Sequence, residues 1–304
     1  MAATTTATYF NSMEQNFSGA FPNVVLPTLG GKQIWADLLI YSRFRIQENV
    51  ITRHCRLLGP KDSRLAWGSF EHCEATLERL LAQNPVELKS DHLVLLLHGM
   101  FRSKEAFSPM TRAFRTNGYE AAAINYPSTR RSIEQHANQI DHILEHAPKD
   151  IRRVSFITHS LGGLVARTVL GRQDQPWRQN IKVHRLVLIA TPNQGAALAE
   201  RLGKLQAFHT IGGPVTTELY PEHVQQNIPT PTCPFAIVAG GRSNNKGFNP
   251  FLPGDDDLTV TVDEAHLEGA EDILVVNTLH TFVMIHPAVI RLTQHYLETG
   301  KFME

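Results

Sequence analysis

The stretch VSFITHSLGGLVAR, from Val154 to Arg167, combines the apolar pattern of a buried strand with an immediate change to the pattern of a helix. Ser160 lies at this turn. A serine hydroxyl is a weak nucleophile unless it is exposed beside a base and beside donors for an oxyanion, and a strained strand-to-helix turn provides that exposure. The usual sequence of such a turn is G-x-S-x-G. Here it is T-x-S-x-G, because Thr158 takes the place of the first glycine. In isolation, a serine that merely caps a helix explains it equally well.

Short apolar runs surround this stretch and alternate with amphipathic segments, which is typical of strand-helix-strand crossovers. The runs lack polar alternation, as expected for strands that are covered on both faces of a parallel sheet. They are Leu93–Leu97, Glu120–Asn125, Val154–Thr158, Leu186–Ala190, Phe235–Ala239 and Ile273–Val276. Local signals predict the helix ends: a cap at Ser108-Pro109, a capping box at Ser132 and Gln135, and a last helix from about Pro287 to Gly300. The pattern predicts an α/β fold with a mostly parallel central sheet and helices on both faces.

The loop after the first of these runs carries His98, Gly99 and Met100. When a serine nucleophile lies on a strand-to-helix turn, two backbone N–H groups form the oxyanion hole. One belongs to the residue after the serine, and the other belongs to a loop at this place in the chain. The donors would be the N–H groups of Met100 and Leu161. His98 itself is expected to organise the loop rather than to act in catalysis.

In proteins whose serine nucleophile stands on a strand-to-helix turn of this kind, the acid and then the base follow the serine along the chain, so we look for both after Ser160. Asp255, Asp256 and Asp257 follow the run at 235–239, and His280 follows the run at 273–276. The three aspartates are also compatible with a solvated acidic loop or a calcium site, although the alternation and the final Glu of an EF-hand are absent. Since the chain has 15 histidines, position must select among them. His280 directly follows the final strand, and His286 is its close rival.

Composition limits the function classes. The chain has 304 residues, with 29 Lys and Arg against 29 Asp and Glu, so no basic surface calls for nucleic acid or anionic lipid. Hydrophobic residues make up 42%, which suffices for a large core. Three widely spaced cysteines predict neither a disulfide framework nor a CxxC metal site. The chain begins without a secretory pattern and has no apolar run that would span a bilayer, so we expect a cytoplasmic protein without a transmembrane segment.

The domain organisation is expected to be simple. Residues 1–30 lack a sustained period and predict a loosely held arm, and residues 31–304 predict one domain. Before the parallel sheet, Ile46–Leu58 predicts one or two strands and His72–Asn84 a helix. The segment from Gly195 to Thr232 is too long for one crossover and predicts an apolar cap insertion at about 195–232, with Phe208 and Leu219 facing the site. A structural cover for the sheet edge is the alternative.

Several stretches together resemble the lipase/esterase-like branch of the α/β-hydrolase superfamily. LLLHGM (Leu95–Met100) resembles the family's oxyanion strand and loop, and THSLGG (Thr158–Gly163) resembles its nucleophile turn. The segment Leu188–Gly195 is similar to the lipase-like TPxxG segment. Asp257-Leu258-Thr259-Val260 resembles the acid loop D-G-x-V, with Leu258 in the place of the glycine, and His280 resembles the terminal histidine. The resemblance runs from about Leu93 to the C-terminus.

This resemblance implies the α/β-hydrolase fold and a serine hydrolase that cleaves carboxylic esters through an acyl-enzyme. Ser160 would be the nucleophile, His280 the base and Asp257 the acid, with Met100 and Leu161 at the oxyanion hole. Neither a cofactor nor a metal is implied, and the expected ligand is a small-molecule or lipid ester. Acyl transfer or amide hydrolysis by the same triad, or a non-catalytic lipid-binding member of the fold, stay open as alternatives.

Overall fold

The computed structural model describes residues 33–203, 205–244 and 246–303, and within these ranges it contains a six-stranded parallel sheet. The strand order is β10-β9-β8-β7-β5-β6, and each neighbouring pair is parallel. The strands are β5 (His92–Leu97), β6 (Glu120–Ile124), β7 (Arg153–His159), β8 (Lys182–Ile189), β9 (Phe235–Gly241) and β10 (Asp272–Asn277). Each overlaps one of the six apolar runs, so the predicted central sheet is confirmed. The arm predicted over residues 1–30 lies outside the described residues.

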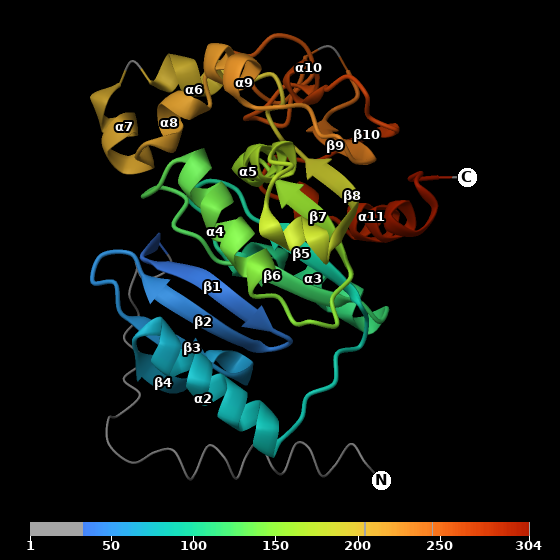
Figure 1. Cartoon of the computed structure of the whole chain (residues 1–304). Helices are drawn as coiled ribbons and strands as arrows, with labels where there is room; N and C mark the ends of the chain where they lie inside the picture. The colour runs from blue at the N-terminus through green and yellow to red at the C-terminus, as the bar shows by residue number, and fades with distance from the viewer. Residues whose placement is uncertain (1–32, 204, 245, 304) are drawn as a thin grey trace.

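Helices cover both faces of this sheet (Figure 1). Successive side chains of a strand point to opposite faces. Phe156 of β7 packs in one core cluster with residues of α4 (Ile133–Glu145) and α5 (Leu161–Gly171). Its neighbour Ile157 packs in a second cluster with residues of α3 (Ser108–Thr116) and α11 (Pro287–Thr299). The continuous apolar runs are therefore explained by burial on two sides.

In the described part of the chain, a second sheet precedes the parallel one and is antiparallel with four strands in the order β1-β2-β3-β4. Its strands are β1 (Trp35–Tyr41), β2 (Phe44–Asn49), β3 (Cys55–Leu58) and β4 (Arg64–Gly68), and α2 (Phe70–Gln83) follows. Ile46, Leu57, Cys73 and Leu77 form the core between this sheet and α2. The sequence predicted the strands at 46–58 and the helix but missed β1 and β4; β4 is short and partly exposed.

Between β8 and β9 the chain forms a group of short helices at the end of the molecule away from the β1–β4 sheet (Figure 1). They are α6 (Ala197–Leu202), α7 (Gln206–Gly212), α8 (Val215–Glu218) and α9 (Pro221–Asn227). Leu219 is buried in the main core, so the expectation that it faces a substrate is wrong. Leu202, Leu205 and Ile211 are the exposed large apolar side chains on α6, α7 and their connection.

The ends of the longer helices follow local signals. Ser132 and Gln135 form the predicted capping box at the start of α4, and α11 ends at Gly300, which has a left-handed φ of 86°. The prediction that Ser108 caps α3 is wrong, because the helix already begins at Ser108. The remaining short elements are α10 (Val262–Ala265), η2 (Pro60–Asp62), η3 (Lys104–Phe107), η4 (Pro176–Gln179) and η5 (Val283–Ile285). None of the helices among the described residues has the length and apolar character needed to cross a membrane.

Candidate active site

Ser160 lies on a strained turn between β7 and α5. Its φ of 53° and ψ of −124° lie in a region that non-glycine residues rarely adopt. Its side chain makes no capping hydrogen bond to the helix, so a capping role does not explain the residue. The two glycines that follow are required by close contacts: a Cβ on Gly162 would lie 2.2 Å from the Leu97 carbonyl oxygen, and one on Gly163 would lie 2.1 Å from Thr191 Oγ1. Strained backbone of this kind is typical of functional sites.

Thr158 takes the place of the usual first glycine without disturbing this turn. Its side chain is fully buried within the sheet, and its hydroxyl donates to the Val187 carbonyl oxygen at 3.0 Å on the neighbouring strand β8. The departure from G-x-S-x-G therefore adds a contact between strands and leaves Ser160 in place.

The loop predicted to supply an oxyanion donor lies directly beside Ser160. A Cβ on Gly99 would lie 3.0 Å from Ser160 Cβ, so a residue larger than glycine would crowd the serine. Leu161 is the first residue of α5, where backbone N–H groups have no acceptor within their own helix. Among the described residues, no hydrogen bond is donated by the N–H of Met100. These N–H groups are thus available at the edge where Ser160 lies, and their role as oxyanion donors stays a prediction.

Asp257 and His280 are brought together at the same edge of the sheet. His280 Nδ1 donates to Asp257 Oδ2 at 2.7 Å, and the backbone N–H of His280 donates to the Asp257 carbonyl oxygen at 2.8 Å. The Asp257 side chain is 1% exposed, and its Oδ1 accepts from the N–H groups of Thr259 and Val260. A buried carboxylate that holds the Nδ1–H of an imidazole orients the ring and leaves Nε2 able to accept a proton.

The three aspartates have different surroundings. Asp255 Oδ1 accepts from the N–H groups of Arg242 and Asp256. Asp256 is fully buried, and its carboxylate accepts from the N–H groups of Asn249 and Leu258. The alternative of a solvated acidic loop is therefore wrong for Asp256, which is buried and organises the loop. Backbone donors occupy all three carboxylates, which does not favour the calcium alternative.

Leu258 explains how the acid loop keeps its shape without the usual glycine. Its φ is 90°, the left-handed conformation that a glycine adopts without steric cost. The residue is 47% exposed, so the leucine is not part of the buried core. The backbone conformation at this position matches a glycine position, which agrees with the alignment of Asp257 with the family's acid.

His159 is a residue of this site that the sequence reasoning missed. It is buried, and its Nε2–H donates to the His280 carbonyl oxygen at 2.9 Å, while the two rings lie 4.7 Å apart. Burial, assisted by the nearby His280, lowers the pKa of His159 well below its ordinary value, so the ring is neutral. His159 ties the segment that carries His280 to the residue before Ser160. The sequence held no spacing signal for it, because the contact joins residues 121 positions apart.

Among the described residues, no hydrogen bond links the Ser160 hydroxyl to His280. Such bonds between a nucleophile and its base are often formed only when substrate is bound.

His98 supports the loop, as predicted, and does so through Tyr126. The two rings stack with centroids 4.0 Å apart, and the Tyr126 hydroxyl donates to the His98 carbonyl oxygen. His98 Nδ1–H donates to the Gly99 carbonyl oxygen at 2.8 Å, which fixes the tautomer.

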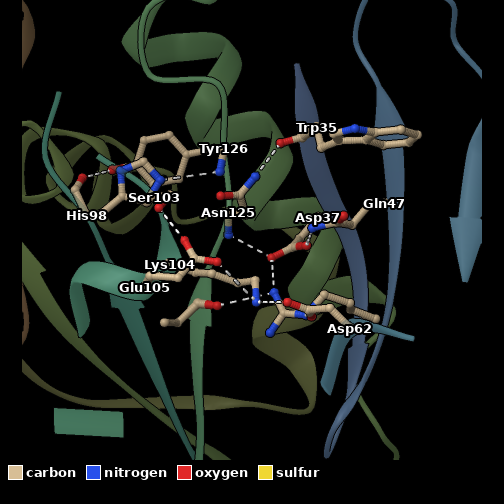
Figure 2. A network of polar contacts seen from close by, with 12 residues as sticks. Trp35, Asp37, Gln47, Asp62, His98, Ser103, Lys104, Glu105, Asn125 and Tyr126 are labelled. Carbon is tan, nitrogen blue, oxygen red and sulfur yellow. Dashed lines mark hydrogen bonds and ion pairs between the residues drawn. The ribbon is translucent and has the colours of Figure 1, made fainter. Parts of the chain in front are cut away.

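The chain before Tyr126 is anchored in turn by the N-terminal sheet (Figure 2). The buried carboxylate of Asp37 on β1 accepts from the Asn125 backbone N–H at 2.7 Å, from Arg45 at 2.6 Å and from Gln47 at 2.7 Å. A buried hydrogen-bonded network of this kind holds its members in one arrangement. The antiparallel sheet, for which the sequence suggested no role, thus supports the loop beside Ser160.

His286, the rival of His280, has a structural role. Its Nδ1 accepts from the backbone N–H of Ala288 at 3.3 Å, so the side chain caps the start of α11. The structure brings His280 to Asp257 and leaves His286 at this helix end.

Buried neutral imidazoles predict that the protein loses stability in acid. Burial lowers the pKa of His98 to about 4 and that of His136 to about 3, from an ordinary value of 6.5. Between pH 6.5 and 4 the unfolded chain holds protons on these residues that the folded chain does not, so the free energy of unfolding falls as pH falls, by about 1.4 kcal/mol per pH unit for each. Urea unfolding at several pH values measures this slope. His136→Phe, which removes one titrating ring, should have a shallower slope; an unchanged slope would contradict the assignment.

Comparison with known proteins bears on the fold of the chain. A family model described as a domain of unknown function, DUF7379, matches residues 63–219. No curated protein matches the chain. The lipase BlEst2 of Bacillus licheniformis in its mature form has a TM-score of 0.53 at 19% identity, with 68% of this chain and 91% of that chain covered. Phospholipase PlaB from Legionella pneumophila has a TM-score of 0.52 at 13% identity, with 68% of this chain and 58% of that chain covered. At these identities the similarity shows the fold alone, which is the α/β-hydrolase fold predicted from the motifs.

Proposed function

Since this chain belongs to the family described as a domain of unknown function, DUF7379, whose description assigns no activity, we propose its function from the site itself: it is a serine hydrolase that cleaves carboxylic esters through an acyl-enzyme. One observation carries the proposal, namely the hydrogen bond of 2.7 Å between Asp257 and His280 beside the strained turn of Ser160. A buried carboxylate and imidazole pair next to a serine that makes no capping hydrogen bond is the arrangement that activates a hydroxyl nucleophile.

The proposed reaction proceeds in two halves. His280 Nε2 accepts the proton of the Ser160 hydroxyl as its oxygen attacks the ester carbonyl carbon, and the N–H groups of Leu161 and Met100 donate to the oxyanion that forms. The carbonyl re-forms, the bond to the alcohol breaks, and the alcohol leaves with the proton from His280. Water then attacks the acyl-enzyme, His280 takes its proton, and the acid product leaves as Ser160 regains its hydrogen. Throughout, Asp257 stabilises the imidazolium and holds the ring.

The substrate class is proposed to be a small-molecule or lipid ester with an apolar acyl group. Three loops that carry site residues expose large apolar side chains: Phe101 is 52% exposed, Leu258 47% and Phe282 50%. Phe101 directly follows Met100, Leu258 follows Asp257, and Phe282 lies two residues after His280. The structural neighbours named as a lipase and a phospholipase are in keeping with this class. The predicted cytoplasmic location stays a prediction.

His280→Ala, compared with His286→Ala, tests this function. We expect His280→Ala to lose nearly all turnover of p-nitrophenyl and glyceryl esters, because His280 is the imidazole that the buried Asp257 orients and that accepts the serine proton in the proposed reaction. His286→Ala should keep its kcat/KM and lose only some stability, since it removes a helix cap worth about 1 kcal/mol. Steady-state kinetics and thermal unfolding of both variants measure this. An active His280→Ala together with an inactive His286→Ala would contradict the proposal. Amide substrates assayed beside the esters test the alternative that the protein is an amidase.

The insertion at 195–232 is proposed to be a mobile cap over the acyl site rather than a structural cover alone. It contacts the oxyanion loop, because a Cβ on Gly212 would lie 2.5 Å from the end of the Met100 side chain. The neighbouring Ile211 is 66% exposed and Leu205 is 58% exposed. Lids of this kind gate access to active sites.

The double variant Leu205→Ser and Ile211→Ser should therefore lower kcat/KM for long-chain esters by about tenfold relative to acetate, which corresponds to about 1.4 kcal/mol of lost apolar contact. Ile51→Ser is the matched control, since Ile51 is 68% exposed on the hairpin between β2 and β3 and away from the insertion. Equal losses for all chain lengths would make the insertion a structural cover.

A further inference from the structure

The last turn of α4 and the residue that caps it bring together three side chains that can bind a metal ion. One ligand atom each from His142, Glu145 and His146 lies within 4.8 Å of the others. Their spacing in the sequence is His-x-x-Glu-His, and residues three and four apart lie on one face of a helix. In one class of metallopeptidases the two histidines of this spacing bind zinc, and the glutamate acts as the base.

The two imidazoles are arranged with ring nitrogens available. His146 Nδ1–H donates to the His142 carbonyl oxygen at 2.9 Å, which leaves Nε2 of His146 with a free lone pair. Metal-binding histidines commonly have their second nitrogen held in this way. The rings of His142 and His146 lie 4.1 Å apart, and each also contacts the ring of Phe70, at 5.6 Å and 5.5 Å.

The electrostatic surroundings favour a cation. His142 and Glu145 line an open hollow that is also lined by the carboxylates of Glu134, Asp141 and Asp174 and by one guanidinium, that of Arg172. The Arg172 guanidinium already pairs with Glu134 and Asp141, so the negative charge that remains in the hollow is that of Glu145 and Asp174. The site also lies at the C-terminus of α4, where the backbone carbonyl groups carry partial negative charge.

We propose that His142, Glu145 and His146 form a binding site for a divalent transition-metal ion of the zinc type, with water in the remaining position. Two imidazole nitrogens and one carboxylate oxygen are a donor set that Zn²⁺ accepts, whereas Ca²⁺ and Mg²⁺ prefer oxygen ligands alone. The site is separate from Ser160, because α4 ends before the amino end of β7 and Ser160 follows the carboxyl end of that strand. A bound ion would stabilise the last turn of α4. The proposed metal site does not depend on whether the protein hydrolyses esters.

Titration of the metal-free full chain with ZnCl₂ by isothermal calorimetry tests the proposal. We expect one ion to bind to the wild type, and His142→Gln and His146→Gln to weaken binding by at least about 10-fold to 100-fold, the loss seen when a group that orients a metal ligand is removed. His72→Gln on α2 is the matched control, because His72 is exposed and lies outside the cluster; it should bind as the wild type does. MgCl₂ and CaCl₂ should give no binding at this site.

Thermal unfolding with and without ZnCl₂ provides a second readout. The ion should raise the midpoint for the wild type and for His72→Gln but not for His146→Gln, since a ligand that binds only the folded state stabilises it. Midpoints without metal check that the variants fold. The proposal is overturned if the wild type binds no Zn²⁺, if either cluster variant binds it as the wild type does, or if Mg²⁺ competes equally.

Discussion

Ser160→Ala should reduce ester turnover by about 10⁶-fold, the loss typical for removal of an activated serine nucleophile. The Ser160 side chain provides the attacking oxygen in the proposed reaction and makes no capping hydrogen bond to α5. Alanine therefore removes the chemistry and little of the packing. Initial rates with a p-nitrophenyl ester measure the loss, and circular dichroism and thermal unfolding show whether the fold is kept.

A fluorophosphonate probe gives an independent test of the same residue. It should form a covalent adduct on the peptide that contains Ser160 in the wild type and none on Ser160→Ala. Ser108→Ala is the matched control, because Ser108 is an exposed residue at the start of α3. Activity of Ser160→Ala within tenfold of the wild type, with an intact fold, would refute the serine hydrolase. A labelled protein without turnover of any ester would point to acyl transfer or another substrate.

Asp257→Asn should reduce kcat by about 10⁴-fold, because an amide in this position favours the wrong tautomer of the base. Asp257 Oδ1 accepts from the N–H groups of Thr259 and Val260, so the amide oxygen of the variant would keep that place. The amide NH₂ group would then face His280 Nδ1 and donate to it. The proton of the ring would move to Nε2, which could no longer accept one from Ser160. Steady-state kinetics at saturating ester measure the effect on kcat.

The neighbouring aspartates provide the controls. Asp255→Asn should remain near the wild type, since an amide oxygen can still accept from Arg242 and Asp256. Asp256→Asn should lose about 1–3 kcal/mol of stability, because Asp256 is fully buried and its carboxylate accepts from Asn249 and Leu258. A near-normal Asp257→Asn with an inactive Asp255→Asn would place the acid elsewhere.

Much of the parallel sheet and its helices could be predicted from the sequence, since apolar runs and capping residues act over a few positions. The capping box of Ser132 and the final Gly300 are such local signals. The strands β1 and β4 were missed for a physical reason. Sheet strands are stabilised by their neighbours, and the partly exposed β4 carries no continuous apolar run. Leu219 was misjudged because an apolar residue in an insertion has the same pattern whether it faces a substrate or the core.

The sequence by itself determined the order of the strands along the chain, the turn at Ser160 and the residues considered for nucleophile, acid and base. These features depend on local sequence patterns and on motifs whose spacing resembles that of a known family. Only the tertiary structure decided which distant groups meet: His159 with the His280 carbonyl, 121 residues apart, and Asp37 with Asn125, 88 residues apart. It also separated the fully buried Asp256 from the Asp257 that holds His280. Contacts across such separations are created by packing of the two sheets and their helices, and no local pattern encodes them.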